Sequence, residues 1–577
     1  MSLPSAVPGV LGETSLDDFD VVIIGSGPGG CAAAHILTQA NLSVLVLEAG
    51  NNYFLGLDDP APGKPTPLFG SDELKQSARF FGKQDPLIEP RTYRENAAVP
   101  GLANGDVNTL GRTVGGAWIH ADVKVPRFNE VDFRMASALH DAGRVYDGAN
   151  FADWPLTYAE LEPWYSMAEQ LSGVSGTTTG EGADPFASPR SGPYPMPPNN
   201  RMYADLVLSE GSRLAGYHPI VYPAAVNSRP YDGRPACVSC GLCSGYGCPN
   251  NSKGSGAVTM LRKALLTGRC QVRYNCFVTR LVHSGRTVTG VEYIDDRSDR
   301  LTVGGDRFIL AASPIEDARL CFLSDPGGAG LGNSSGLVGR NLMFHLQTIA
   351  VGIFKQRMHG ERGQSVTGGM VDFRGVEPGG MALAKDGRPL GGIIEFGTNS
   401  EAIDEAKQYG RQEITSIAGQ LGLGLKQLML DSPLRDHLAV MIMQAEDAPQ
   451  LGNRVDLDPS VTDVYGVPVP RVTHVSHAFE LQASQYYQPR MVEVIGKAGA
   501  QFGFVNPDLD KLGTRHVMGT LRMGTDPSAS VCNAAGKFHD LDNLYCGDGA
   551  VFPTASGYNP TLTIIALALR MADAIGG

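Results

Sequence analysis

The sequence predicts an α/β protein whose main parallel sheet is assembled from segments that lie far apart along the chain. A β-branched run, Asp20 to Ile24, ends in a glycine-rich turn, and Cys31 to Ala34 then begin a helix. A second run covers Ser43 to Leu47, and further runs typical of βαβ units appear at Val272 to Val282, Val288 to Ile294 and Phe308 to Ala312. Short continuous apolar runs are typical of parallel strands buried on both faces. We therefore expect the N-terminal and central runs to belong to one discontinuous domain.

The length and charge of the chain narrow the class of protein. At 577 residues the chain exceeds the roughly 250–300 residues that one hydrophobic core usually supports, so we expect two domains or one domain with large insertions. Hydrophobic residues make up 42% of the chain, as in a globular enzyme. The net charge is −13, and acidic and basic residues are interspersed. This pattern argues against nucleic acid or an anionic membrane surface as a partner.

The first eighteen residues predict a disordered lead-in. They contain proline and serine, lack a basic region and hold only a short apolar patch, so they do not form a signal peptide. No apolar stretch approaches the roughly 20 residues of a membrane helix, and the C-terminal one is interrupted by Arg570 and Asp573. We therefore expect a cytoplasmic protein without a membrane span.

The first glycine-rich turn has the spacing of a dinucleotide-binding motif. It reads Gly25-Ser26-Gly27-Pro28-Gly29-Gly30, and Glu48 ends the next strand. Glycines at this spacing permit a tight turn and bring a pyrophosphate close to the helix N-terminus, while the carboxylate accepts hydrogen bonds from ribose hydroxyls. A glycine-rich turn without a ligand is the alternative, and the strand–turn–helix context argues against it.

A second glycine pair near the C-terminus favours FAD over NAD. Gly547-Asp548-Gly549 is separated from the N-terminal motif by almost the whole length of the chain. FAD is an extended molecule and needs a second set of contacts along its ribityl chain. Asp548 can accept a hydrogen bond from a ribityl hydroxyl. Taken alone, it would indicate only a carboxylate in a turn.

The residues with the clearest chemical role are His516 and Asn559. Oxidation of an alcohol needs a neutral base at the hydroxyl, and an imidazole desolvated beside a flavin stays neutral near pH 7. Asn559-Pro560-Thr561 opens an apolar run and predicts a helix with Asn559 as N-cap and Pro560 as its first residue. The positive end of that helix would stabilise negative charge on a reduced flavin. Without further context, a buried structural histidine would be an equally good interpretation of His516.

Two insertions separate these motifs. Residues 172–200 are rich in Gly, Ser, Thr and Pro, and this length predicts a lid or a subunit contact. Residues 346–506 mix strand-like and helical runs, and we expect them to carry substrate specificity.

Several motifs, in the same order, resemble those of the glucose-methanol-choline (GMC) oxidoreductases, and the likeness extends from Asp20 to Ile575. The segment Gly111-Arg112-Thr113-Val114-Gly115-Gly116, followed by His120, is similar to the family's second flavin-binding segment. The runs 309–316, 336–342 and 453–459 are also similar to family segments, although Ser313 stands where the family usually has glycine. The pattern around His120 and His516 resembles the branch of pyranose oxidases and of sugar and long-chain alcohol dehydrogenases.

The resemblance implies a GMC-type fold with two domains. A Rossmann-like FAD-binding domain would comprise residues 19–130, 220–345 and 507–577. An α+β substrate-binding domain with an antiparallel sheet would comprise residues 131–219 and 346–506, with the lid-like loop 172–200.

The resemblance also implies the site residues. His516 and Asn559 would be catalytic, with Asn559 also bonding the substrate hydroxyl. Hydride would pass to flavin N5, with His516 as base. The implied FAD-binding residues are Gly25, Gly27, Pro28, Gly29, Gly30, Glu48, Arg112, Gly115, Gly116, His120, Val278, Ala312, Gly547, Asp548, Asn559, Pro560 and Thr561.

The implied attachment of FAD is non-covalent. In pyranose oxidases the histidine that matches His120 can be bonded to the flavin, and a tryptophan often follows it. Here the next residue is Ala121, so we expect a histidine packed near the flavin, with covalent linkage as the alternative.

Four cysteines, Cys237, Cys240, Cys243 and Cys248, lie within twelve residues. Their spacing resembles the cysteine motif of a ferredoxin with one added residue. An iron–sulfur cluster at these cysteines could carry electrons away from reduced FAD. A zinc site or disulfides are further alternatives. We expect packed thiols or a disulfide rather than a metal.

Together these features predict an FAD-dependent oxidoreductase that oxidises a CH–OH group of a sugar, glycoside or other alcohol. The electron acceptor would be O₂, a quinone or a protein. The alternatives are a hydroxynitrile-lyase-like enzyme of the same fold and a dehydrogenase that uses an iron–sulfur cluster. The exact substrate, the choice between oxidase and dehydrogenase, and the oligomeric state stay open at this point.

Overall fold

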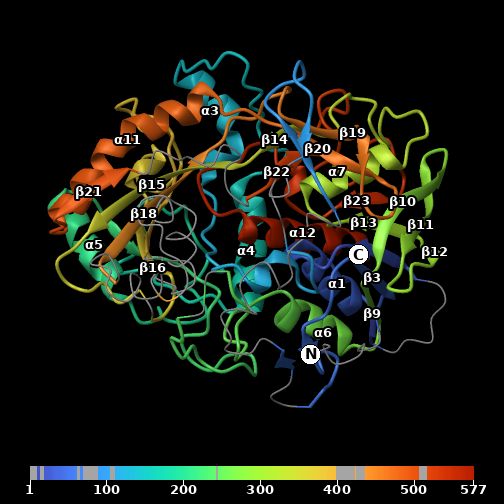
Figure 1. The fold of residues 1–577 in the computed structure, drawn as a ribbon, viewed down its shortest axis with the longest axis horizontal. Helices are drawn as coiled ribbons and strands as arrows, with labels where there is room; N and C mark the ends of the chain where they lie inside the picture. Colours follow the sequence, from blue (N-terminus) through green and yellow to red (C-terminus); the bar gives the residue numbers. More distant parts are fainter. Residues whose placement is uncertain are drawn as a thin grey trace.

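The computed structural model describes residues 9–12, 19–61, 65–68, 89–103, 111–241, 243, 245–360, 362–397, 423, 436–505 and 516–577. Figure 1 shows two halves side by side, with α1, β3 and β9 in one and β15, β18 and α5 in the other. The predicted lead-in lies mostly outside the described residues, but β1 (Val10–Leu11) forms a strand antiparallel to β9. The expectation of disorder is therefore wrong for these two residues.

A six-stranded sheet with the order β1-β9-β3-β2-β13-β23 forms the centre of one half. All its neighbouring pairs except β1–β9 are parallel. The prediction of a discontinuous parallel sheet is confirmed, because the strands come from three distant parts of the chain: β2 (Val21–Ile24), β3 (Val44–Glu48), β9 (Cys270–Tyr274), β13 (Arg307–Leu310) and β23 (Leu544–Cys546).

Helices with apolar faces pack against this sheet and against each other. The sequence of α1 (Pro28–Gln39) is rich in alanine, and its small side chains let it lie close to α12 (Thr561–Gly576). The helix α12 also contacts α4 (Tyr158–Ser172). Further helices are α3 (Met135–Asp141), α6 (Arg262–Leu265) and α7 (Pro314–Leu323).

The run from Val272 to Val282 is divided between two strands. The left-handed residue Asn275 (φ 56°) breaks it into β9 and β10 (Phe277–Ser284), which join different sheets. Strands β10, β11 (Thr287–Ile294) and β12 (Arg300–Gly304) form an antiparallel meander. This part is therefore not a βαβ unit.

The other half is built on an antiparallel six-stranded sheet, as predicted for the substrate-binding part. Its order is β21-β15-β18-β17-β16-β8, and α5 (Tyr203–Leu214) and α11 (Ala478–Lys497) contact it. The strands are β8 (Pro219–Val221), β15 (His345–Ile353), β16 (Val366–Met370), β17 (Ile394–Gly397), β18 (Leu438–Glu446) and β21 (Phe502–Val505).

A further six-stranded sheet has the order β22-β14-β19-β20-β6-β7. Its strands are β6 (Thr92–Arg94), β7 (Leu102–Ala103), β14 (Arg340–Met343), β19 (Arg454–Thr462), β20 (Pro468–Thr473) and β22 (Met518–Thr520), while β4 (Phe54–Leu55) and β5 (Thr66–Pro67) form a small hairpin. This sheet brings His516, just before β22, to His345, just after β14, since β14 and β22 pair.

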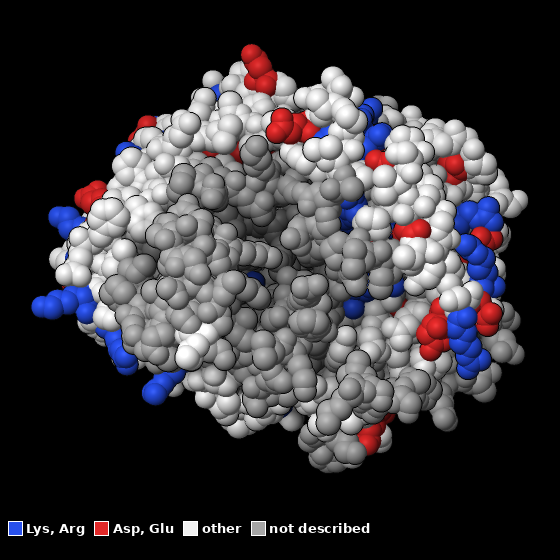
Figure 2. All heavy atoms as spheres, in the orientation of Figure 1, with Lys and Arg blue, Asp and Glu red and all other residues white. Residues whose placement is uncertain are grey.

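The described surface agrees with the charge pattern of the sequence. Figure 2 shows basic and acidic side chains next to each other on the right-hand flank of this face. A search of the described helices finds none that is both long enough and apolar enough to cross a membrane.

Candidate functional site

The glycines of the first turn have two different tasks. A Cβ on Gly29 would lie 1.8 Å from the carbonyl oxygen of Gly547, and a Cβ on Gly30 would lie 2.1 Å from that of Gly25. Gly29 and Gly30 therefore allow close approach of the backbone to Gly547 and to Gly25, respectively. By contrast, a Cβ on Gly27 would have the oxygen of Ala311 as its nearest neighbour, at 3.9 Å. Space therefore remains beside Gly27, at the start of α1.

The second glycine segment lies against the first turn. Gly115 (φ 95°) donates its N–H to Oγ of Ser26 over 3.0 Å, and a Cβ on Gly116 would lie 2.7 Å from Cα of Gly27. Residues 25–30 and residues 115–116 therefore lie against each other in the structure.

Glu48 is buried at the end of β3 and receives protein hydrogen bonds. The backbone N–H and the hydroxyl of Ser26 donate to one oxygen, at 3.0 and 2.6 Å, and the N–H of Gly50 donates to the other at 2.8 Å. Burial raises its pKa. A carboxylate oxygen has two lone pairs, so Glu48 retains capacity to accept from a ligand hydroxyl.

Arg112 lies beside the same strand end. Its Nε donates to the carbonyl oxygen of Ala49 over 3.1 Å, and its guanidinium stands 5.7 Å from the ring centroid of Phe277. Val278 follows Phe277 in β10 and is buried.

Asp548 follows β23 and shares its surroundings with Asp317. The N–H groups of Ser313 and Ala550 donate to Asp548, both at 2.8 Å, and the N–H of Ala312 donates to Asp317 at 3.0 Å. Burial raises the pKa of both carboxyls, and the charge of Asp548 raises that of Asp317 further.

His516 and Asn559, the two residues expected to be catalytic, lie next to each other. Nδ2 of Asn559 lies 3.4 Å from Nε2 of His516 and donates to a Glu395 oxygen over 3.0 Å. The hydroxyl of Tyr222 donates to the Asn559 oxygen over 2.5 Å. Nδ1 of His516 lies 3.0 Å from Nδ1 of His345.

The pKa of His516 lies well below its usual value. Burial is the largest cause, followed by His345 and by the positive charge of Lys124. Lys124 forms ion pairs with Glu395 at 2.5 Å and with Asp122 at 3.0 Å. The site therefore holds a neutral imidazole, as expected from desolvation.

The helix α12 begins one residue later than the sequence suggested. It starts at Thr561 with Pro560 in the N-cap position, and no side chain caps it. Asn559 is not the cap, because Tyr222 and Glu395 hold its amide in the site. The first turn of α12 contains no acidic residue, so its N–H groups and positive end stay open to an anionic group.

His120 is buried and follows a short 3-10 helix, Gly116–Ile119. A Cβ on Gly111 would lie 2.9 Å from Cε1 of its ring. Gly111, which has no side chain, thus makes room for this imidazole.

The four clustered cysteines are free thiols and line one small cavity together with Lys253. Cys240 is exposed, while Cys243 is buried, which raises its pKa to about 12. The ammonium group of Lys253 donates to the carbonyl oxygens of Ala121 and Tyr246, at 2.9 and 3.0 Å. Metal binding at the cysteines, given little weight above, stays an untested prediction.

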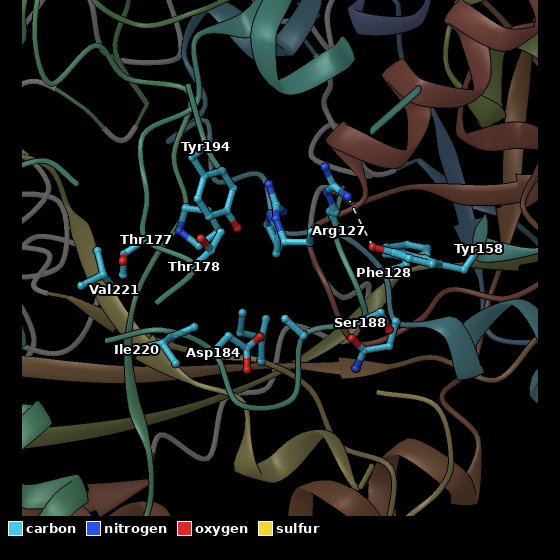
Figure 3. A pocket seen from close by; sticks show the side chains of 16 residues that line it. Arg127, Phe128, Tyr158, Thr177, Thr178, Asp184, Ser188, Tyr194, Ile220 and Val221 are labelled. Atoms are coloured by element: carbon cyan, nitrogen blue, oxygen red, sulfur yellow. Dashed lines mark hydrogen bonds between the residues drawn. The ribbon is translucent and has the colours of Figure 1, made fainter. Parts of the chain in front are cut away.

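The loop 172–200 lines a cavity of its own (Figure 3). Thr177, Asp184 and Tyr194 point into it from the loop, and Arg127 points into it from the other side. Arg190 ties the loop to Glu169 of α4 over 2.6 Å. Burial raises the pKa of Asp184 to about 7. The lid-like role stays a prediction, and the described loop is anchored to the body.

Sequence reasoning missed four residues around His516 and Asn559: Lys124, Tyr222, His345 and Glu395. One signal was present, since Glu395 stands as a single acid in the apolar run Ile393-Ile394-Glu395-Phe396. An acid in a buried strand needs a partner, which is Lys124 here. Nothing in the sequence around His345 points to His516.

Comparison with known proteins places most of these elements in family domains. Two models described as GMC oxidoreductase match residues 205–347 and 449–568, and a model described as an NAD(P)-binding Rossmann-like domain matches residues 23–57.

Two curated relatives are similar over almost their whole length. The gluconate 2-dehydrogenase flavoprotein of Pantoea cypripedii is 26% identical, covering 98% of this chain and 95% of the relative. The 2-methyl-1,2-propanediol dehydrogenase of Mycolicibacterium austroafricanum is 29% identical, covering 97% and 96%. The wider set includes sugar dehydrogenases and a pyranose 2-oxidase, which confirms the predicted branch.

Among solved structures, pyridoxine 4-oxidase from Mesorbium loti has a TM-score of 0.60 at 16% identity, covering 96% of this chain and 99% of that one. This likeness concerns the fold alone, and it agrees with the two-part architecture described above.

Proposed function

The chain belongs to the GMC oxidoreductase family and is an oxidoreductase, and from this premise we propose that it oxidises a CH–OH group to a carbonyl with FAD. The observation that carries the proposal is the neutral imidazole of His516, held against Asn559 near the open start of α12.

The residues of the structure fit FAD. The helix α1 starts with Pro28, has no side-chain cap and has no acid in its first turn, so its N–H groups can face a pyrophosphate. The space beside Gly27 lies at this helix start. Glu48 and Asp548 offer carboxylate oxygens for ribose and ribityl hydroxyls, and the start of α12 offers positive charge for the flavin pyrimidine.

Bound FAD would supply the acceptor for the two electrons and the hydrogen that leave the carbinol carbon as hydride. In the proposed reaction Nε2 of His516 accepts the hydroxyl proton as the C–H bond breaks and the C=O bond forms. Its lowered pKa keeps Nε2 available near pH 7.

Asn559 fits the role of a catalytic partner that orients the base. Its N–H group faces Nε2 of His516, and the Tyr222 and Glu395 contacts fix the amide plane. In this arrangement a substrate hydroxyl would lie beside both side chains. Asn559→Asp would place a carboxylate beside Glu395 and disrupt this orientation.

We further propose that FAD is bound without a covalent bond. His120 is buried among the glycine segments, and Ala121 replaces the tryptophan that the pattern of covalently linked relatives would predict.

The proposed substrate class is a sugar, a glycoside or another small alcohol. The relatives named for gluconate and for 2-methyl-1,2-propanediol support a hydrophilic hydroxyl compound. The acceptor that reoxidises the enzyme is proposed as O₂ or another small-molecule or protein oxidant.

The test is an anaerobic screen of the FAD-loaded protein against sugars, sugar acids, glycosides, diols and aromatic alcohols. Bleaching of the flavin absorbance by at least one class, with recovery after an oxidant is admitted, is expected. Cleavage of a cyanohydrin without bleaching by any alcohol would refute the proposal. Recovery in air, compared with recovery by a quinone, distinguishes oxidase from dehydrogenase.

A further inference from the structure

Two imidazole rings meet beside the proposed substrate position. Nδ1 of His345 and Nδ1 of His516 are 3.0 Å apart, with ring centroids 4.9 Å apart and ring planes at 83°. A neutral imidazole has one donor and one acceptor nitrogen. A hydrogen bond between two Nδ1 atoms therefore needs a single proton, so the two rings must be opposite tautomers.

The contacts of Asn559 decide which ring carries that proton. The Glu395 carboxylate, paired with Lys124, can only accept, so it must face the NH₂ group of Asn559, while the amide oxygen faces the Tyr222 hydroxyl. The same NH₂ group lies 3.4 Å from Nε2 of His516. An N–H group facing Nε2 is favourable only if Nε2 has no proton.

The other side of His345 agrees with this assignment. His345 is the first residue of β15 and is fully buried. It is paired with Glu446 of the neighbouring strand β18. Burial lowers its pKa to about 4, the nearby backbone carbonyl groups of Ala555 and Ser556 raise it by a smaller amount, and among the described residues Nε2 makes no hydrogen bond of normal geometry. Carbonyl oxygens beside the ring favour a proton on the nitrogen that points away from His516, and a neutral ring with that proton has an unprotonated Nδ1 facing His516.

We propose that His345 is a positioning residue that accepts the Nδ1–H of His516 and thereby presents the lone pair of Nε2 to the substrate hydroxyl. This inference rests on the proposed function and deepens it. When Nε2 takes the substrate proton, His516 becomes an imidazolium whose Nδ1–H still points to a neutral acceptor.

A neutral acceptor differs from a carboxylate in one useful respect. Both fix the tautomer, but a carboxylate also attracts the imidazolium and raises the pKa of the base. His345 fixes the proton without that attraction. The charged groups that act on the two rings, Lys124 on His516 and Arg374 on His345, both lower the pKa of the ring they face.

The direct test is the protonation of the His516 ring in the oxidised holoenzyme without substrate. Protein labelled with ¹⁵N in its histidine rings is measured by solid-state NMR, and the His516 signals are identified by their loss in His516→Gln. A protonated Nδ1 with a bare Nε2 is expected. A proton on Nε2 of His516 would overturn the proposal whatever the activity, because this measurement needs no substrate.

The kinetic test compares two substitutions of His345. His345→Asn keeps an acceptor oxygen at the place of Nδ1, while His345→Leu fills the space without one. We expect the limiting rate of anaerobic flavin reduction to fall about 10- to 1,000-fold in His345→Leu, with little change in substrate dissociation constant, and to recover at least about tenfold in His345→Asn.

Outcomes separate this inference from the proposed function. If no alcohol bleaches the wild-type flavin, the proposed function fails, and the NMR result still decides the tautomer. If the wild type bleaches but His345→Leu is equally fast, or if Asn and Leu are equally slow with an unchanged His516 spectrum, the positioning role is refuted.

Discussion

At the residue scale, the site is a set of polar side chains whose hydrogen bonds leave few alternatives. Tyr222 and Glu395 determine the orientation of Asn559, and Asn559 and His345 face the two nitrogens of His516. Buried polar groups are costly unless they are paired. Replacing one member is therefore expected to change the behaviour of its neighbours as well.

Replacing His516 by alanine is expected to abolish flavin bleaching by the alcohol substrate and to leave FAD bound. The base is lost, while the glycine turns and Glu48 that would hold the nucleotide are untouched. Bleaching is followed by absorbance in an anaerobic cell. The exposed His140 supplies the control, since His140→Ala should bleach like the wild type, and normal bleaching by His516→Ala would refute the assigned role.

The acid limb of the flavin-reduction rate is expected to lie below pH 6.5. The pKa of His516 is lowered well below 6.5, so the base stays unprotonated as the pH falls through neutrality and becomes protonated only at lower pH. Stopped-flow reduction rates between pH 4.5 and 8 measure this limb. A loss of rate centred above pH 6.5 would contradict the burial of the base.

The flavin is expected to leave the protein on denaturation. Because His120 is proposed to pack near FAD without a bond, acid precipitation should leave the yellow colour in the supernatant. His120→Asn should retain FAD after desalting. A coloured pellet from the wild type that becomes colourless in His120→Asn would instead establish the covalent link.

At the scale of elements, the site depends on where strands and helices end. The turn after β2, the loop after β23 and the start of α12 meet at the carboxyl edge of the parallel sheet. Ligands of open α/β sheets bind at this edge. The closest approach is that of Gly29 to the carbonyl oxygen of Gly547.

Gly29→Ala is expected to weaken FAD binding and lower the melting temperature. The new Cβ would lie 1.8 Å from the Gly547 oxygen, so α1 and the loop after β23 must move apart. Flavin content after gel filtration and the thermal midpoint report the effect. The control is Gly496→Ala in α11, where no atom lies within 4 Å of the added Cβ and alanine favours the helix by about 0.5–1 kcal/mol. Equal flavin content in both variants would show that the contact is not needed.

At the scale of the whole molecule, the described residues form two large hydrophobic cores, one in each half, and a small third one beside α7. The larger one surrounds the parallel sheet with α1, α4 and α12, and a second lies between the antiparallel sheet and α5 and α11. The fold class and the discontinuous sheet could be predicted, because glycine spacing and apolar runs are local signals.

Other features could not be predicted because they depend on contacts between distant segments. His345 reaches His516 only through the pairing of β14 with β22, and Lys124 reaches Glu395 from a different element. The division of 272–282 into two strands depends on one left-handed asparagine, and asparagine often occurs in ordinary turns as well.

Cavities in the two cores are expected to have different functional effects. Ile565 of α12 belongs to the larger core and Ile495 of α11 to the second, and both are fully buried. Either residue changed to alanine should cost about 2–5 kcal/mol of stability. Only Ile565→Ala should release FAD at a lower temperature, as followed by flavin fluorescence. Equal early release from Ile495→Ala would show that the cores unfold together.

The place of β23 in the parallel sheet has a consequence for folding during synthesis. During synthesis β2 and β3 leave the ribosome early, but β23, the loop with Asp548 and α12 follow only after the entire antiparallel sheet has been made. The N-terminal part of the proposed FAD site must therefore stay incomplete until the C-terminal segments have been synthesised. Domains usually fold as units, so the half with the antiparallel sheet can fold first, and the proposed FAD site is complete only in a nearly full-length polypeptide.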